Sequence, residues 1–405
     1  MMERKLKRNI TVLYIFSFFW MSMIIIPIIV PFFESKGLTL SQVFYLQAIF
    51  AFFVVVFEIP SGYVADMLGR KNALLAGSLF HGLGYSWLYF ADSFVGLVAF
   101  EMLVGIGLSL LSGADLSLLY DSQEALGQSP EEKTRGIANM RFSKSVAEGV
   151  SALIGGVLIA WSFEVTVIAN AMAACVPLVL ACFLVEAPFT KMAKGQHKEN
   201  LKEVVYHLFV RDRFLRLICL NTTFFGLATF YVVWMLQPYW REQGIPLTAF
   251  GLLWAAQSFL FAAATKACIP LEKRFGARPL LIVMGLLPIF GYIGMSSLGG
   301  VLGILLSFSF FLCRGINQVL LTDALNSRVS SSFRATANSM TSFTFRFIYI
   351  VTGPIVGLMI DKLGMQVTLF ALGILGIGLF LTALLPLLKG VEEVEQANRE
   401  LLAKS

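Results

Sequence analysis

Several ionisable residues of this sequence stand inside long apolar runs, where a side chain can do chemistry that uses a proton or a charge. Glu101 and Asp115 lie in the run 94–119. With Leu108 they follow the spacing i, i+7, i+14, which places the three residues on one face of a helix. A carboxylate held there can bind a proton or a cationic substrate. The alternative is that both carboxylates lie at the rims of the run, where water solvates them.

A second group of charges lies in the run 137–161. Arg141, Lys144 and Glu148 fall within two helical turns, and Lys144 and Glu148 have the i, i+4 spacing of partners on a helix surface. One interpretation is a structural cluster that neutralises itself. The other is a switch, in which protonation of Glu148 releases Arg141 or Lys144 during a conformational change.

The run 301–325 carries Arg314, Asn317 and Gln318 on one face. An arginine without a partner in its own helix suits an anionic substrate group or a carboxylate such as Glu101. Polar and aromatic residues elsewhere would complete the walls of a cavity, although simple helix packing explains them equally well: Tyr14, Trp20, Asn221 and Trp234.

The composition indicates which solvent surrounds these runs. Of the 405 residues, 57% are hydrophobic and 14% are charged, and the mean hydropathy is +0.78. Soluble domains carry roughly 45–50% apolar and about 25% charged residues, so the runs are expected to cross a lipid bilayer. A charged side chain at the centre of a spanning helix costs about 2.5–3.5 kcal/mol, so each charge named above is a hypothesis about function.

The apolar runs predict an all-α integral membrane protein with twelve spans. The first run is too long for a signal peptide and has no small-residue cleavage site behind it, so it is expected to be a retained span. Turn-forming residues separate the spans. The expected ranges are 10–33, 42–65, 73–91, 94–119, 137–161, 165–185, 214–238, 249–270, 279–298, 301–325, 335–360 and 365–388.

The distribution of basic residues predicts the orientation. Most of the 31 Lys and Arg residues fall in segments that are cytoplasmic if the N-terminus is cytoplasmic, and the outer loops hold Lys36, Arg241 and Lys362. Cytoplasmic loops of membrane proteins carry this excess. We therefore expect a multi-pass protein of the cell membrane with both termini inside. The net charge of +6 needs no nucleic-acid partner to explain it.

The chain divides into two related halves. We expect a six-helix bundle over 1–185, a cytoplasmic amphipathic linker over 186–213, a second six-helix bundle over 214–388 and a cytoplasmic tail over 389–405. Three short matches lie in register between the halves: "LLYD" at 118–121 with "LLTD" at 320–323, Arg135 and Asn139 with Arg334 and Asn338, and Gly69 with Gly276. Parallel repeats that face each other across a cavity form one of the transporter architectures.

The charged segment 58–71, "EIPSGYVADMLGRK", falls between the second and third expected spans. Gly62, Asp66, Gly69, Arg70 and Lys71 match the pattern G-x-x-x-D-x-x-G-R-K/R, and through it the chain resembles the major facilitator superfamily of secondary transporters. The resemblance implies two six-helix bundles related by a pseudo-two-fold axis along the membrane normal. It also implies that the segment is a latch.

In that latch, Asp66 would contact the start of the eleventh span on the cytoplasmic side and release it as the cavity opens inward. Gly69 would allow the tight reversal of the chain, and Arg70 and Lys71 would anchor the inner surface. Glu58, about two turns earlier, would extend the network.

Two other patterns of the family are incomplete here. Where many proton-coupled members carry R-x-x-Q-G in the fourth span, this chain has Glu101 and Val104 before Gly105. The fifth-span pattern G-P-x-x-G-G of drug antiporters is reduced to "SALIGG" at 151–156, while "GPIVG" occurs at 353–357. The resemblance therefore leaves membership of the drug-efflux branch open.

Two functions within transport fit these residues. The first is proton-coupled export of a hydrophobic or amphipathic compound, consistent with the 37 phenylalanines and the carboxylates of the spans. The second is symport or facilitated diffusion of a polar metabolite such as an amino acid, sugar, organic anion or siderophore, which Arg314, Asn317 and Gln318 favour. The expected partners are a small-molecule substrate, a proton and the lipid bilayer, with the protein a monomer.

Other classes of function lack their motifs. The sequence has no G-x-x-x-x-G-K-[ST] loop for nucleotide-driven transport and no HExxH, GxSxG or paired-cysteine site, so an enzyme is not expected. The five cysteines lie in apolar runs without a CxxC pair, so neither a metal nor a cofactor is expected.

Overall fold

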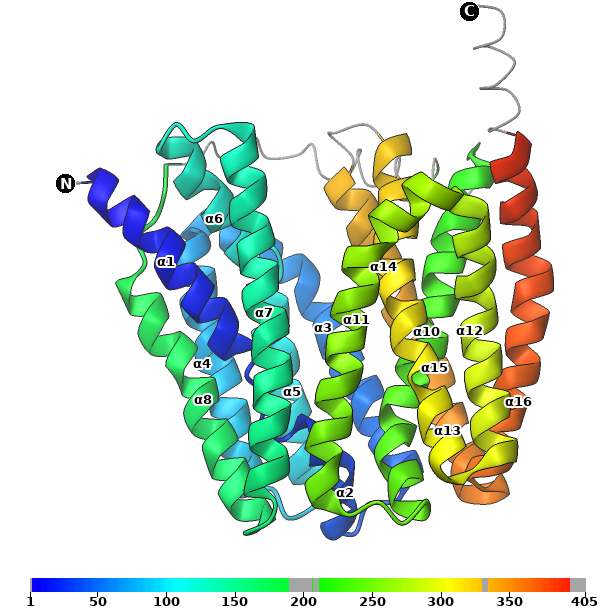
Figure 1. Ribbon diagram of the computed structural model, residues 1–405. Coiled ribbons are helices and arrows are strands. Elements are labelled where there is room, and N and C mark those ends of the chain that lie inside the picture. The colour runs from blue at the N-terminus through cyan, green and yellow to red at the C-terminus, as the bar shows by residue number, and fades with distance from the viewer. Residues whose placement is uncertain (1, 189–205, 207–210, 330–333, 394–405) are drawn as a thin grey trace, which may run out of the picture. The chain divides into compact units, whose positions relative to one another are not determined.

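The architecture consists of helices joined by short turns. The computed structural model describes residues 2–188, 206, 211–329 and 334–393, and it describes side chains in these ranges except at residues 59–68 and 335. These ranges contain no strand (Figure 1). In chain order the elements are α1 (Met2–Trp20), the 3-10 helix η1 (Ile26–Ile28), α2 (Ile29–Ser35), α3 (Leu40–Leu68), α4 (Arg70–Leu88), α5 (Phe94–Leu111), α6 (Ala114–Ala125), α7 (Pro130–Leu158), α8 (Phe163–Phe183), α10 (Arg213–Glu242), α11 (Leu247–Phe275), α12 (Ala277–Leu298), α13 (Gly300–Ser307), α14 (Ser309–Arg328), α15 (Arg334–Leu363), α16 (Met365–Leu379) and the π-helix η3 (Phe380–Leu384).

Helix occupies every predicted span. In the described ranges nine helical stretches are long and apolar enough to cross a membrane, from Leu40–Glu58 to Met365–Glu393. The remaining predicted spans correspond to α1 with α2, to α4 and to α7, which are helical but shorter or more polar. The prediction of an all-α membrane protein is confirmed.

The helices group into two compact units. Unit 1 comprises Met1–Met192 and Ile245–Ser258, and unit 2 comprises Ala193–Gly244 and Phe259–Ser405. The first part of α11 therefore groups with unit 1, which the boundaries expected from the sequence did not anticipate. The predicted linker 186–213 lies almost wholly outside the described residues.

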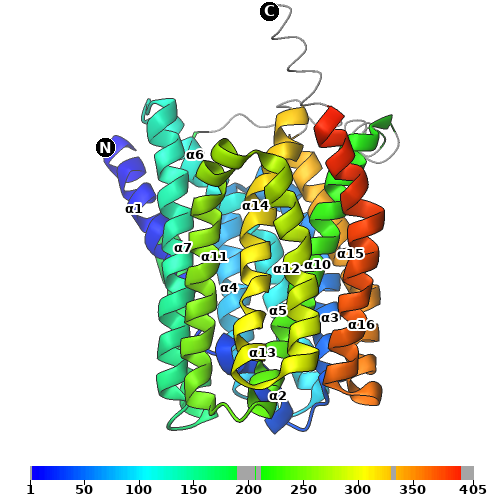
Figure 2. The ribbon, with the colours of Figure 1, turned by 45° about the vertical axis from the view of Figure 1, so that its right-hand side comes forward.

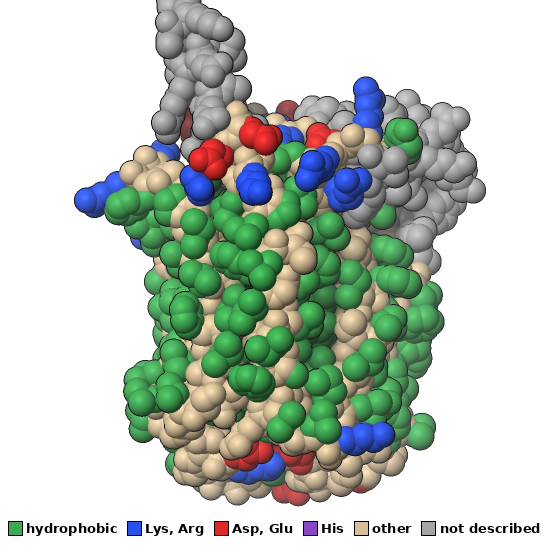
Figure 3. All heavy atoms as spheres, turned by 90° about the vertical axis from the view of Figure 1, so that its right-hand side faces the viewer, with side chains coloured by type: hydrophobic (Ala, Val, Ile, Leu, Met, Phe, Trp, Pro, Cys, Tyr) green, Lys and Arg blue, Asp and Glu red, His purple; other side chains and the backbone are tan. Residues whose placement is uncertain are grey.

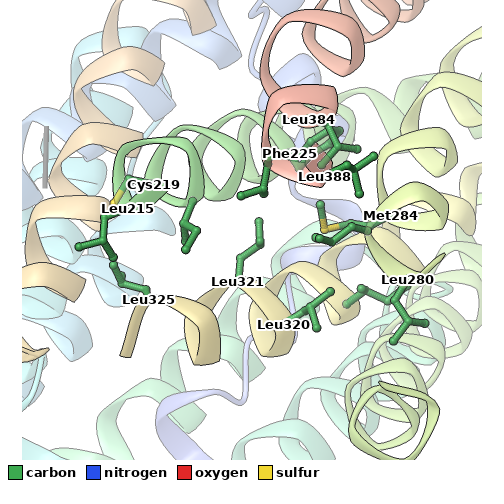
Figure 4. Packing of buried hydrophobic residues seen from close by; sticks show 14 of the residues in the cluster. Leu215, Cys219, Phe225, Leu280, Met284, Leu320, Leu321, Leu325, Leu384 and Leu388 are labelled. Atoms are coloured by element: carbon green, nitrogen blue, oxygen red, sulfur yellow. The ribbon is translucent and has the colours of Figure 1, made fainter. Parts of the chain in front are cut away.

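Each unit has its own packing pattern. In unit 1, α4 packs against α5 and α8, and α1 packs against α6, α7 and α8 (Figure 1). In unit 2, α10 packs against α14 and α15, and α12 packs against α14 and α16 (Figure 2). Figure 4 shows the buried core of unit 2, which gathers side chains from several elements, among them Phe225 of α10, Met284 of α12, Leu321 of α14 and Leu384 of η3.

Close approach replaces the hydrophobic effect as the main source of helix association in a bilayer, because lipid tails are as apolar as leucine. Gly77 of α4 and Gly107 of α5 show this approach: a Cβ added to either would lie 3.0 Å from the backbone oxygen of the other. The outer surface is correspondingly apolar. Side chains such as Phe370 and Ile374 of α16 are exposed, and Figure 3 shows this face as a hydrophobic band between charged ends.

The first span is not one continuous helix. α1 ends at Trp20, and helix resumes only at Ile26. Pro27 explains the interruption, since its ring lacks an N–H and would clash with the carbonyl of residue 23 in a continuous helix. The freed backbone is partly satisfied by α8, because the N–H of Ile25 donates to Asn170 Oδ1 at 3.1 Å. Gly155 of α7 makes room for the break: a Cβ there would lie 2.1 Å from the oxygen of Ile24.

The fourth span, like the first, is interrupted. Gly113 has φ +80 and separates α5 from α6. Glu101 and Asp115 therefore do not share one continuous helical face, contrary to the prediction from their spacing. The dipeptide Ser112-Gly113 was the sequence signal for this turn.

Candidate functional site

An ion pair joins the second half of span four to span five inside unit 1. Asp115 lies in the first turn of α6, and its side chain is 6% exposed; the Nζ of Lys144 on α7 lies 2.7 Å from its Oδ2, with 31% of the lysine side chain exposed. The turn at Gly113 reorients α6 and brings Asp115 to α7. A buried carboxylate needs such a partner, because an unpaired buried charge is costly.

Lys144 is therefore not the partner of Glu148, as its i, i+4 spacing predicted. Glu148 is half-buried and accepts a hydrogen bond from Ser258 Oγ of α11 at 3.3 Å, within unit 1. Arg141, one turn before Lys144, is exposed. The charged residues of α7 therefore do not neutralise one another: Lys144 pairs with α6, and Glu148 bonds to the first part of α11.

Glu101 is the most deeply buried carboxylate among the predicted site residues whose side chains are described. Glu101 lies on α5 and is 3% exposed. Gln47 Nε2 of α3 donates a hydrogen bond to Glu101 Oε1 at 2.7 Å. An amide satisfies a carboxylate oxygen without neutralising it. Glu101 therefore has a hydrogen-bond donor and no cation among its described contacts.

An aromatic group surrounds the break in span one. The Trp20 ring stacks on His81 of α4 with a centroid distance of 4.1 Å, and His81 contacts Tyr85 at 4.9 Å. His81 is 2% exposed, and its Nδ1 has no hydrogen-bond partner among the described residues. Sequence reasoning missed His81, although a lone histidine in an apolar run was the available signal. Tyr14, by contrast, is half-buried, and its carbonyl accepts from Ser143 Oγ at 2.8 Å.

The segment predicted to be a latch, 58–71, joins the end of α3 to the start of α4 in unit 1. Gly69 has φ +94, so the chain reverses there as predicted. The backbone N–H groups of Arg70 and Lys71 donate to the two oxygens of Glu186 at 2.8 and 2.9 Å. A carboxylate at a helix N-terminus is favoured by the exposed N–H groups and the helix dipole. Glu186, which follows the sixth span, was not among the predicted residues.

The side chain of Arg70 ties this end to α6. Its guanidinium forms an ion pair with Asp121 and donates to the backbone oxygen of Ser117 at 2.9 Å. Glu58 is half-buried on α3. The predicted latch residues Gly62 and Asp66 belong to α3, but their side chains lie outside the described residues.

Unit 2 repeats this arrangement in part. Gly276 precedes α12 with φ +83, as Gly69 precedes α4. Arg278, at the position of Lys71, pairs with Glu392 at 3.0 Å, so a glutamate at the end of the last span contacts the start of the third span of its unit. Ala277 stands where unit 1 has Arg70. No ion pair in the described ranges involves Asp323, the counterpart of Asp121.

Two of the predicted cavity residues of unit 2, Asn317 and Trp234, lie where α10 meets α14 and α15. Asn317 Nδ2 of α14 donates to the backbone oxygen of Thr222 on α10 at 3.2 Å. Arg314 and Gln318 are exposed on the same helix, and the guanidinium carbon of Arg314 lies 5.0 Å from the ring centroid of Phe261. Trp234 of α10 joins an aromatic cluster through Phe230, at a centroid distance of 6.1 Å.

Asn221 lies apart from this group. Its Nδ2 donates to the carbonyl of Leu217 at 2.8 Å and to that of Ala383 in η3 at 3.0 Å, and the residue is fully buried. A π-helix shifts the hydrogen-bond register, and π-bulges are frequent at functional sites. Here the amide compensates one of the displaced carbonyls, so Asn221 supports the packing of α10 against the last span.

The sequence and the fold were compared with those of known proteins. The family model of the Major Facilitator Superfamily matches residues 11–348. The uncharacterized MFS-type transporter YxaM of Bacillus subtilis (strain 168) is 22% identical over 366 residues, covering 84% of this chain and 86% of that protein. The MFS-type transporter ppzB of Metarhizium rileyi is 29% identical over 104 residues, so the match spans 26% of this chain and only a fifth, 20%, of that relative.

Solved structures show the same fold. The nucleoside transporter NupG, as its D323A mutant, superposes with a TM-score of 0.79 at 12% identity, covering 94% of this chain and 99% of that chain. A D-xylose-proton symporter gives a TM-score of 0.69 at 13% identity, over 92% and 96% of the two chains. The fold, the family model and the predicted motif agree, and the chain belongs to the Major Facilitator Superfamily of transporters.

Proposed function

We propose that this transporter exports an amphipathic organic compound across the cell membrane by alternating access, in exchange for protons. The observation that carries the proposal is the presence, in both units, of polar or charged side chains within spans whose lipid-facing residues are apolar. Glu101 in unit 1 and Arg314 in unit 2 are the central examples. A charge in hydrocarbon is costly, so such residues face water, a substrate or one another.

Glu101 supports the coupling to protons. A buried carboxylate whose described partner is the Gln47 amide can exist as the acid or as the anion, with only a reorientation of that amide. Burying the anion without a cation costs free energy, and binding a proton removes the charge. The pair Asp115–Lys144 is a second element of the proposed cycle, since loss of either charge would release α6 from α7.

The aromatic side chains support the amphipathic class of substrate. Phe230 lies among Trp234, Phe345 and Tyr349 in unit 2, and Trp20 and His81 stack in unit 1. Aromatic walls bind apolar surfaces of varied shape, as small-molecule sites commonly do. A drug-antiporter role belongs to this proposal.

A second candidate function is transport of a polar metabolite. Exposed Arg314 and Gln318 beside Asn317 favour it. NupG is a nucleoside transporter and the xylose protein a proton symporter by their descriptions, and at 12% and 13% identity these likenesses concern the fold.

The proposed topology follows the basic residues: both termini are cytoplasmic, and the protein acts as a monomer with its bundles bounded at 1–185 and 214–388. The proposed latch comprises Gly62, Asp66, Gly69, Arg70 and Lys71, with Glu58 extending it. Two contacts support this proposal: the Arg70 side chain pairs with Asp121 of span four, and Glu186, after span six, accepts from the first N–H groups of span three.

Reconstitution into liposomes tests the function. With an inside-acidic pH gradient, protons leave the liposome, so exchange should drive uptake of lipophilic organic compounds. This uptake should stop when an ionophore dissipates the gradient. If the gradient drives a polar solute and moves no lipophilic compound, the second candidate function replaces the first.

A further inference from the structure

One face of unit 2 combines a cation that has no ionic partner among the described residues and a group of aromatic rings. Resting on the proposed transport function, we propose that this face binds an aromatic organic anion: a planar ring against Phe230 and a carboxylate or similar group on Arg314. Neither the family match nor the similar proteins assign such a site.

The first observation is that the face meets water. Arg314 and Gln318 are exposed near the middle of the apolar stretch Gly300–Arg328. The exposed residues of α16, such as Phe370 and Ile374, are apolar. A guanidinium would be costly among lipid tails, so the Arg314 side of α14 must line an aqueous or substrate-filled space.

The second observation concerns Arg314 itself. The Phe261 ring of α11 lies 5.0 Å from its guanidinium carbon, and within the described ranges no carboxylate pairs with Arg314. A cation–π contact fixes the position of a guanidinium and leaves its N–H donors free for a planar anion. Arg314 is therefore positioned and not neutralised.

Asn317 connects the cation to the aromatic group. It follows Arg314 by about one turn and is 6% exposed; its Oδ1 has no hydrogen-bond partner among the described residues. Its Nδ2 lies 3.9 Å from the position of a Cβ on Gly226, a half-buried glycine of α10. Gly226 therefore marks the point at which Asn317 of α14 lies beside α10, next to the aromatic group.

The aromatic group begins one turn beyond Gly226. Phe230 is half-buried, and it contacts Phe345 at 5.5 Å and the fully buried Tyr349 at 4.8 Å between ring centroids. Phe345 also lies 3.3 Å from the Cβ position of Gly226. Phe230, like Phe345, is half-buried, so a ligand can reach the Phe230 ring without displacing Tyr349.

The direction of the helices sets the distance between ring and cation. α10 and α14 are three spans apart in chain order, so they run antiparallel. Asn317 lies beside Gly226 and bonds to Thr222 of α10, and both Arg314 and Phe230 lie about one turn from this point toward the same side of the membrane. Neighbouring helix axes are about 8–10 Å apart. This separation matches a one- or two-ring aromatic acid.

Binding to the purified full-length protein tests the inference. The probes are 2-naphthoate, its neutral analogue 2-naphthamide and the saturated cyclohexanecarboxylate. We expect Arg314→Gln to weaken 2-naphthoate by at least about tenfold while leaving 2-naphthamide nearly unchanged, which also shows that the variant is folded. Phe230→Ala should weaken both aromatic probes, and Arg314→Lys should restore part of the 2-naphthoate affinity.

Two matched variants serve as controls. Arg274 stacks on Phe275 at 5.2 Å, so Arg274→Gln removes the same kind of contact elsewhere on α11. Phe370→Ala removes an exposed ring from α16. Neither should change binding of any probe. Equal 2-naphthoate affinity in wild type and Arg314→Gln, absence of 2-naphthoate binding by wild type, or cyclohexanecarboxylate binding as tight as that of 2-naphthoate would each overturn the inference.

The same preparations in liposomes separate this inference from the proposed function. If wild type moves another solute along a pH gradient but does not bind 2-naphthoate, the anion site is wrong and the transport function stands. If 2-naphthoate binds through Arg314 but no pH gradient moves any probe, the site stands and the proton-coupled function is wrong.

Discussion

Lys144 Nζ lies 2.7 Å from Asp115 Oδ2, and this ion pair joins α7 to α6. The turn at Gly113 sets the direction of α6, and the spacing of charged residues along the sequence did not reveal it. The lysine comes from α7, and the aspartate from the short helix α6. Asp115 is nearly inaccessible, so its charge depends on this lysine. The pair is therefore a point at which one protonation or one substitution changes the connection between spans four and five.

Replacing Lys144 with Met should destabilise the protein by roughly 2 kcal/mol, because it leaves the Asp115 charge buried without a cation. The expected loss is below that of a fully buried pair, since Lys144 is partly exposed. Thermal unfolding in detergent measures it. The double variant Asp115→Asn with Lys144→Met should be more stable than Lys144→Met alone; equal stability of the two would contradict an ionic role for the pair.

Glu101→Gln should abolish the acceleration of transport by an imposed pH gradient. The glutamine keeps the size of the side chain and a hydrogen bond to Gln47, but it has no proton to exchange. Exchange of labelled for unlabelled substrate at equal pH should persist, because that half-reaction needs no net proton movement. Coupling that survives in Glu101→Gln would remove Glu101 from the mechanism. Glu164→Gln at the start of α8 is the control, and its coupling should be normal.

Glu186→Gln should lower the free energy of unfolding by about 1 kcal/mol, since it replaces a charged acceptor at the N-terminus of α4 with a neutral one. Glu392→Gln in unit 2 is the matched control. Its pair with Arg278 is largely exposed, with 43% of the glutamate side chain accessible, so its loss should cost less than about 0.5 kcal/mol. Chemical denaturation of both variants gives the comparison, and equal losses would argue against the capping role.

Gly155→Ala should disturb the break in span one, because the new Cβ would lie 2.1 Å from the oxygen of Ile24. The backbone must shift to relieve this overlap, at a cost of about 1–3 kcal/mol. Gly378→Ala on α16 is the control, since a Cβ there meets nothing within 4 Å. We expect Gly155→Ala to melt at a lower temperature than the wild type and Gly378→Ala to melt at the wild-type temperature. Unchanged melting of Gly155→Ala would show that the break does not depend on α7.

Asp66→Asn should abolish turnover while leaving substrate binding largely intact, as the latch hypothesis requires. The test compares steady transport with equilibrium binding on the same preparation. Loss of binding, with accessibility to membrane-impermeant thiol reagents unchanged, would count against a latch and favour a role in the substrate site.

The helices and several turns followed from the sequence because local rules determine them. Apolar runs of membrane length fix where spans lie, and the reversals at Gly69 and Gly276 require positive φ, which glycine adopts without strain. The interruptions of spans one and four did not follow from the length of the apolar runs, because they depend on local backbone chemistry. Pro27 and the pair Ser112-Gly113 carried that information.

The partners of the charged residues did not follow from the sequence, because they depend on how separate helices rotate against each other. Spacing along α7 favoured Glu148 as the partner of Lys144, but tertiary packing offered Asp115 instead. Glu186 and His81 were overlooked for the same reason: the importance of each comes from a contact with a distant element, Arg70 and Trp20 respectively.

The replacement of Arg70 by Ala277 at the corresponding site of the second half has a consequence for local stability. Arg70 links α4 to Asp121 and Ser117, whereas the start of α12 has one ion pair, exposed to solvent, in the described ranges. Local opening requires less free energy where fewer buried contacts must be broken. The amide hydrogens at the start of α12 should therefore exchange with deuterium faster than those at the start of α4. The two halves of the chain would then differ in local rigidity at this position, with the start of α4 opening less often than the start of α12.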